Sequence, residues 1–204
     1  MNDIADILNG ADDQQLSLIS GLEGQFIQAM SCKEKADIEA ALKTLITDSE
    51  KAIATHGESA ELLSIFASAK AELANVWSNP KSIPLLSESK KALDKAIELK
   101  PLALDGLAEA TLAGLFYFAP GKPFSFGNKK QGIKIFEDSL EELPESLELQ
   151  FQYANLLVAA RKKDRARELY QSALKAIDAP AQQRRDAFKQ ARKAAIEAAL
   201  AKLG

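Results

Sequence analysis

Few side chains in this sequence could carry out covalent or metal chemistry. The chain of 204 residues has one histidine, His56, and one cysteine, Cys32. A single cysteine cannot form an intramolecular disulfide, and one histidine with one cysteine cannot supply the usual ligands of a structural zinc site. We interpret His56 as a helix C-terminal residue, and Cys32 has no histidine near it in sequence to activate its thiol.

The usual catalytic motifs are also absent from the sequence. It contains no glycine-rich phosphate loop, no Gly-x-Ser-x-Gly elbow and no His-Glu-x-x-His pattern. The acidic pairs Asp12-Asp13 and Glu141-Glu142 fall on the surfaces of expected helices. We therefore expect no enzyme activity, no catalytic residue, no cofactor and no bound metal.

Aromatic residues concentrate in one segment, where they could bind a partner. Residues 116–126 hold five of the 13 aromatic residues of the chain. One hypothesis is that this turn is a lip that grips an apolar or proline-rich segment of another protein. The alternative is that the rings only pack the turn against its own helices, as in many compact long turns.

The elements that must position these residues are helices. Apolar residues recur with a period of 3.6 throughout the chain, and no Val/Ile/Thr-rich alternation predicts a strand. Capping signatures, glycines and prolines divide the pattern, with Asn9-Gly10 predicted to end the first helix and Gly21 and Gly24 to require close packing or a bend. The predicted helices cover residues 2–9, 12–30, 31–56, 58–77, 82–99, 102–118, 128–143, the two halves of 147–180, and 180–203.

A repeat is clearest between Leu147 and Pro180, which reads as two helices joined by a polar turn at Arg161 to Asp164. The ends of successive second helices, at residues 52, 96, 139 and 173, are spaced by 44, 43 and 34 residues. The last spacing is that of a tetratricopeptide unit, and the excess in the other two is placed in turns around 78–85 and 119–127. Small and bulky residues also fall at the offsets of such a unit: Ala154, Leu157, Ala166, Tyr170 and Ala173.

On these residues, the segment 95–180 resembles the tetratricopeptide superfamily. The run Leu115 to Asn128, with its aromatic pair, Pro-Gly, second Pro and Gly-Asn, is similar to a group of bacterial tetratricopeptide-like proteins. The helical T-component associated with TRAP transporters has a related architecture. The resemblance implies a non-enzymatic scaffold that binds a protein or peptide on the concave face of its stacked hairpins.

We therefore expect one all-α domain over 1–204, a tetratricopeptide-like solenoid of about three helical-hairpin units. Residues 57–180 form the units, and 1–56 and 181–204 form N-terminal and C-terminal capping helices. The first helix of each pair should line the concave face, where a foreign ligand, the last helix of the same chain or a second copy could lie. The candidate partner-binding residues on this face and in the aromatic turn are Asp105, Leu112, Phe116, Phe124, Phe126, Glu148, Phe151 and Asn155.

The charge distribution leaves two alternative functions open. The net charge is −3, but residues 161–204 hold 12 Lys or Arg against 5 Asp or Glu. A nucleic-acid or ribosome-associated factor could use this basic end, although a solvated helix face is the commoner explanation and nucleic acid is not the expected partner. The transporter resemblance suggests a helper component that binds an apolar ligand. No stretch predicts a transmembrane segment, and as written the chain is expected in the cytoplasm, or in the periplasm if a leader was removed.

Overall fold

Helices make up all the regular structure of the described residues. The computed structural model describes residues 3–178 and 186–203, and within these ranges it has no strand, which confirms an all-α fold. None of the helices in these ranges is long and apolar enough to cross a membrane. The elements are α1 (Asp3–Ser31), α2 (Lys35–His56), α3 (Ala60–Trp77), the short 3-10 helix η1 (Pro80–Ser82), α4 (Ile83–Leu99), α5 (Ala103–Phe118), α6 (Lys129–Glu142), α7 (Leu147–Ala159), α8 (Lys163–Ala176) and α9 (Asp186–Leu203).

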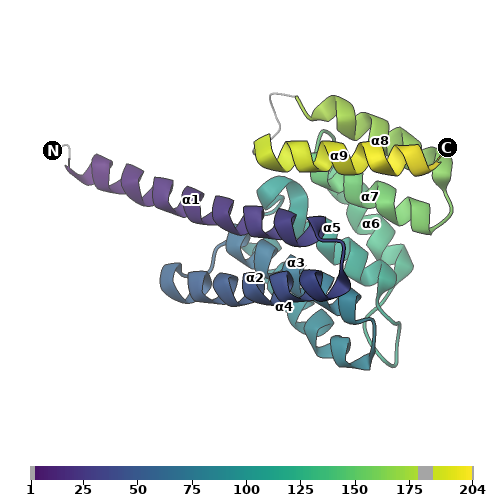
Figure 1. The fold of residues 1–204 in the computed structure, drawn as a ribbon, viewed down its shortest axis with the longest axis horizontal. Coiled ribbons are helices and arrows are strands. Elements are labelled where there is room, and N and C mark those ends of the chain that lie inside the picture. The colour runs from purple at the N-terminus through teal and green to yellow at the C-terminus, as the bar shows by residue number, and fades with distance from the viewer. Residues whose placement is uncertain (1–2, 179–185, 204) are drawn as a thin grey trace.

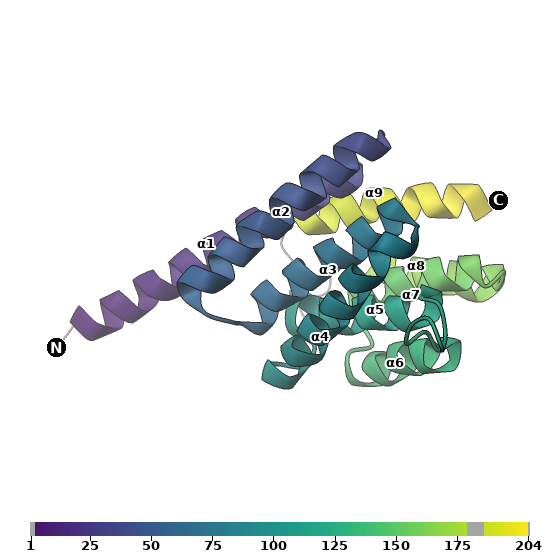
Figure 2. The same cartoon turned by 90° about the horizontal axis from the view of Figure 1, so that it is seen from below.

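Consecutive helices pack against each other in pairs (Figures 1 and 2). The helix α3 packs on α4, α5 on α6, and α7 on α8, while the first members of these pairs also contact one another in the order α3, α5, α7. We call the surface formed by these three helices the α3–α5–α7 face. The helices α1 and α2 form a further pair, and α2 lies on α3. The last helix, α9, contacts α8, α7 and α1.

Local signals set most of the helix ends where the sequence predicted them. Asn128 caps α6 with a hydrogen bond from the Gln131 amide to its side chain, and Ser59 caps α3 in the same way. Gly57 ends α2 with a φ of 83°, a left-handed value that favours glycine. Ser31 does not cap α2 as predicted, because it is the last residue of α1, and Glu34 holds the cap position without a side-chain hydrogen bond.

The first helix differs from the prediction. The helix α1 runs without interruption from Asp3 to Ser31, so Asn9-Gly10 does not end a helix. A glycine inside a helix costs only about 1 kcal/mol relative to alanine, which is too little to stop a helix without a competing turn. A Cβ atom at Gly21 or Gly24 would meet nothing within 4 Å, so the predicted close packing at these glycines is wrong.

The first two spacings of the repeat, 44 and 43 residues, exceed the last one of 34 residues. The structure places these additional residues partly in turns and partly in longer helices. Residues 119–128 connect α5 to α6 as a long turn, as predicted, whereas α3 and α4 are joined by the shorter segment 78–82. The helices α3 and α4 have 18 and 17 residues, against 13 and 14 in α7 and α8.

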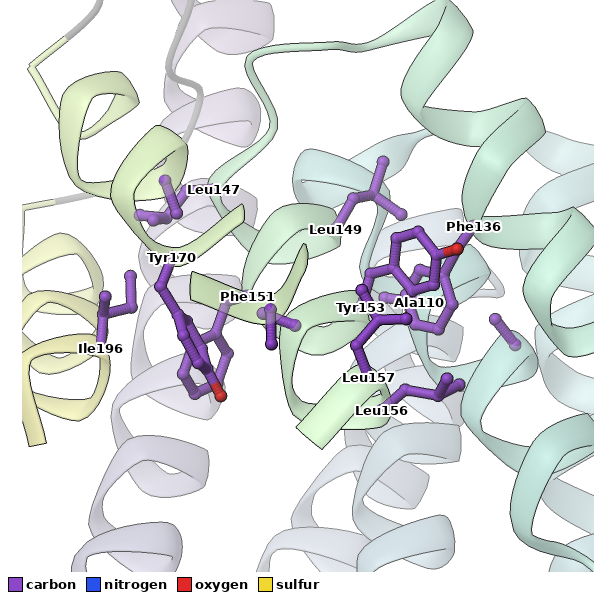
Figure 3. Close-up of a cluster of buried hydrophobic side chains, with 14 of the residues drawn as sticks. Ala110, Phe136, Leu147, Leu149, Phe151, Tyr153, Leu156, Leu157, Tyr170 and Ile196 are labelled. Atoms are coloured by element: carbon purple, nitrogen blue, oxygen red, sulfur yellow. The ribbon is translucent and has the colours of Figure 1, made fainter. Parts of the chain in front are cut away.

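The largest buried cluster of the described residues joins α5, α6, α7, α8 and α9. Figure 3 shows its two aromatic groups: Tyr170 lies with Phe151 near Ile196 of α9, and Tyr153 lies with Phe136 of α6. The rings of Phe136 and Tyr153 stack with centroids 4.9 Å apart. All five residues that defined the predicted repeat unit are buried in this cluster: Ala154, Leu157, Ala166, Tyr170 and Ala173.

Candidate functional site

A groove of about 920 Å³ lies between the C-terminal half of α3, the start of α4 and the C-terminal half of α5. We call it the α3–α5 groove. Its volume falls in the range of pockets that hold ligands in other proteins. Apolar side chains form most of its walls, together with seven polar residues. The apolar lining residues are Ala71, Ala74, Pro80, Ile83, Leu86, Ala110, Leu115, Phe118, Ala119, Pro120 and Phe124, and the polar ones include Glu72, Asn75, Thr111 and Gln152.

Glu72 is the one ionisable side chain among the residues that line this groove. The surrounding protein desolvates its carboxyl group, which raises its pKa, while a hydrogen bond from Asn75 and the positive charge of Arg192 lower it less. The nearby carboxylate of Glu148 adds to the upward shift. Within the described residues Glu72 forms no ion pair, and the charge of Arg192 offsets the upward shift of the Glu72 pKa only in part.

Two aromatic side chains of the groove are exposed. Phe118, at the end of α5, is 62% exposed, and Phe124, in the following turn, is 75% exposed. Single exposed apolar residues are common, but two large rings beside one apolar groove are typical of binding surfaces.

The turn that carries Phe124 has a defined path. The amide of Gly127 donates a hydrogen bond of 2.9 Å to the Pro120 carbonyl, and the amide of Asn128 donates one of 2.6 Å to the Phe116 carbonyl. A Cβ atom at Gly127 would collide with the Ala119 carbonyl, so this close approach requires glycine. The closed turn keeps Phe124 next to the end of α5.

Phe126, in the same turn, packs inward, unlike the exposed Phe124. Its ring meets Phe116 edge to face, with centroids 5.5 Å apart, and both rings pack in the cluster between α3, α4 and α5 together with Leu112. Phe116 and Leu112 are each only 7% exposed. Phe126 and Phe116 therefore pack the turn against its helices, whereas Phe118 and Phe124 line the groove.

The part of the α3–α5–α7 face that belongs to α7 is covered by α9. Arg192 of α9 donates hydrogen bonds of 2.8 and 2.7 Å to the two carboxylate oxygens of Glu148, which is wholly buried. The guanidinium also lies 4.4 Å from the ring centroid of Phe151 and 4.9 Å from that of Phe188. The basic C-terminal end, for which a solvated helix face was the commoner explanation, includes Arg184, Arg185 and Arg192. Arg192 does not lie on a solvated face, and Arg184 and Arg185 fall outside the described residues.

Asp105 is buried and accepts hydrogen bonds from a residue in the first turn of α7 and from the residue before this helix. Its carboxylate accepts a hydrogen bond of 2.9 Å from the amide of Glu148, and its carbonyl accepts one of 2.8 Å from the Ser146 hydroxyl. The backbone reaches this position through left-handed φ values at Leu104, Asp105 and Gly106. A carboxylate at a helix N-terminus satisfies free amides and the helix dipole, so Asp105 fixes α7 against α5.

The structure thus separates the eight candidate partner-binding residues. Glu148 and Phe151 lie under α9, and Asn155 borders a second cavity of about 650 Å³ between α7, α8 and α9. Only Phe124 lies in the α3–α5 groove. The remaining four residues are committed to internal packing or capping: Asp105, Leu112, Phe116 and Phe126.

The candidates that the sequence offered do not include the groove residues Phe118, Glu72, Thr111 and Gln152. Glu72 has a signal that could have revealed it, because it continues the four-residue spacing of Ser64 and Ser68 on the same side of α3. The Ser68 hydroxyl lies 2.8 Å from the Thr111 hydroxyl, and Gln152 donates a hydrogen bond of 3.0 Å to Glu148. The polar side chains of the groove are therefore linked to those beneath α9.

Within the part of the chain that the structure describes, no three His, Cys, Asp or Glu side chains are placed to hold a metal ion. The α3–α5 groove has a mostly apolar lining with one carboxylate, Glu72. No protein-family profile matches the sequence, and no curated protein matches it.

Proposed function

We propose that this protein is a non-enzymatic, tetratricopeptide-like scaffold that binds a segment of another protein in the α3–α5 groove. The observation that carries the proposal is the pair of exposed rings, Phe118 and Phe124, beside an apolar groove on the α3–α5–α7 face. Buried aromatic anchors supply much of the binding energy of protein interfaces. The pairing of α3 with α4, α5 with α6 and α7 with α8 supports a helical-hairpin stack, whose first helices commonly form the binding face.

An apolar small molecule is the alternative occupant, in agreement with a helper component that binds an apolar ligand. The groove volume of about 920 Å³ and its mostly apolar walls favour this second candidate. The basic C-terminal helix gives weaker support to nucleic-acid binding, because Arg192 is engaged by Glu148 within the chain.

Site-specific photocrosslinking in cells tests the proposal. A photoreactive phenylalanine analogue replaces Phe124 in the full chain, and the same analogue at Leu99, an apolar residue of α4 that is 50% exposed, serves as the matched control. We expect protein adducts at position 124 that are absent at position 99 and that disappear when Phe118→Ala is added. Equal labelling at both positions would contradict a protein-binding groove.

A separate measurement tests the alternative that an apolar small molecule occupies the groove. Native mass spectrometry of the purified full chain would reveal a small molecule as a fixed mass increment. An increment that Phe118→Ala/Phe124→Ala abolishes, without protein adducts at position 124, would replace the proposed scaffold by the apolar-ligand function.

A further inference from the structure

The way α9 packs on α7 indicates which kind of helix fits the α3–α5–α7 face. An amphipathic helix lies on α7 with its apolar residues Phe188, Ile196 and Leu203 buried. One arginine, Arg192, enters the face and pairs with the carboxylate of Glu148 at 2.7 Å while its guanidinium lies over the ring of Phe151. Planar guanidinium groups suit this combination of a bidentate carboxylate contact and ring stacking.

The neighbouring groove offers the same chemical groups without such an occupant among the described residues. Its lining contains one carboxylate, Glu72, and no basic side chain, and its exposed rings are Phe118 and Phe124. Among the described residues, the charged groups that shift the pKa of Glu72 are Arg192 and Glu148, which pair with each other. An added cation would therefore meet a desolvated carboxylate, whereas an acidic ligand would be repelled.

We propose that the occupant of the α3–α5 groove is an amphipathic helix of a partner protein that inserts one arginine or lysine toward Glu72 and packs its apolar side chains on Phe118 and Phe124. This inference rests on the proposed function and names the chemistry of the partner. Helix binding in an apolar groove uses anchors at positions i, i+3 or i+4, and i+7, and here one of these anchors is basic. The charge complementarity makes Glu72 the specificity-determining residue of the groove.

A display library of helical peptides tests this inference without a known partner. The library presents 16-residue helices with all positions of one face randomised, and it is selected on the folded full chain. Counter-selection on Phe118→Ala/Phe124→Ala retains only peptides that bind through the groove. Counter-selection on Leu99→Ala, which changes an exposed apolar residue of α4, controls for general apolar binding.

We expect the groove-dependent peptides to carry arginine or lysine at one fixed position of the apolar face. Their Kd should rise at least about 30-fold on Glu72→Gln, since removing one partner of a desolvated charge pair costs this much in protein interfaces. Replacing the basic residue of the peptide by glutamine should weaken binding similarly, and the two changes together should not be additive. Glu61→Gln, on the same helix but paired with Lys100 outside the groove, should leave the Kd unchanged.

The outcomes separate this inference from the function on which it rests. Groove-dependent peptides without a preferred basic residue, or with a Kd that is unchanged by Glu72→Gln, would overturn the inference and leave the binding groove intact. A library that yields no groove-dependent peptide would overturn both. The thermal midpoint of each variant confirms that it is folded before its Kd is interpreted.

Discussion

Arg192 and Glu148 lie 44 residues apart in sequence, yet their side chains form a bidentate ion pair between α9 and α7. The Glu148 side chain is fully buried and that of Arg192 is only 14% exposed. The pair is therefore a buried polar contact that holds the last helix on the α3–α5–α7 face.

Loss of the arginine should destabilise the protein strongly. Arg192→Ala removes the two hydrogen bonds that the guanidinium donates to the buried Glu148 carboxylate, and breaking a buried ion pair costs about 3 to 5 kcal/mol in free energy of unfolding. Arg165→Ala, which breaks an ion pair with Glu137 that is about half exposed, should cost less than about 1 kcal/mol. Urea denaturation of both variants measures the difference, and equal losses would show that the buried pair does not anchor α9.

Tyr170 should be a major contributor to the stability of the last helix pair. Its ring is 1% exposed, and its hydroxyl donates a hydrogen bond of 2.6 Å to Asn155. Tyr170→Ala should lower the free energy of unfolding by about 3 to 5 kcal/mol, as for other buried aromatic truncations. Tyr170→Phe keeps the ring and should lose only about 1 kcal/mol. A loss below about 1 kcal/mol for the alanine variant would contradict the packing described for this ring.

The two phenylalanines of the turn should respond differently to truncation. Phe126→Ala removes a ring that packs on Phe116 and should cost about 2 to 3 kcal/mol of stability. Phe124→Ala removes a ring that is 75% exposed and should change stability by less than about 0.5 kcal/mol. Thermal and urea unfolding of the two variants compare them directly. A large loss for Phe124→Ala would mean that this ring is part of the core.

Glu109 should make the protein less stable as the pH rises. One of its carboxylate oxygens accepts a hydrogen bond of 2.8 Å from the Leu102 amide, and the other is buried without a hydrogen-bond partner in the described residues. Burial raises its pKa in the folded state above the value of about 4.3 in the unfolded chain. Its contribution to stability is therefore fully present below about pH 4.3 and is lost as the pH rises through the folded pKa.

Glu109→Gln removes this dependence and retains the acceptor for Leu102. We expect the variant to match the wild type near pH 4 and to exceed it by about 1 kcal/mol at pH 7.5 in urea unfolding. Glu141→Gln, an exposed change on α6, should leave the pH profile parallel to that of the wild type. A Glu109→Gln variant that is less stable than the wild type at pH 7.5 would contradict the conclusion that the buried Glu109 carboxylate lowers stability at that pH.

The positions of the helices were largely determined by the sequence alone. Asn128 and Pro144 bound α6 because capping hydrogen bonds and the missing proline amide act over a few residues, which a sequence pattern records. The burial of Tyr170 and Ala173 followed from the helical period of apolar residues in the same way. Asn9-Gly10 was the main failure, because a turn signal can be overridden inside a long helix.

The tertiary structure decided which side chains remain open to a partner. Asp105 caps α7 through an amide 43 residues away, Glu148 is covered by Arg192, and Phe126 faces inward while Phe124 faces outward. No local pattern encodes these choices, because each depends on how helices distant in sequence pack and on which groups are thereby desolvated. For the same reason, the sequence predicts only that Glu72 lies on a helix. The packing of α3 against α5 places it in an apolar groove.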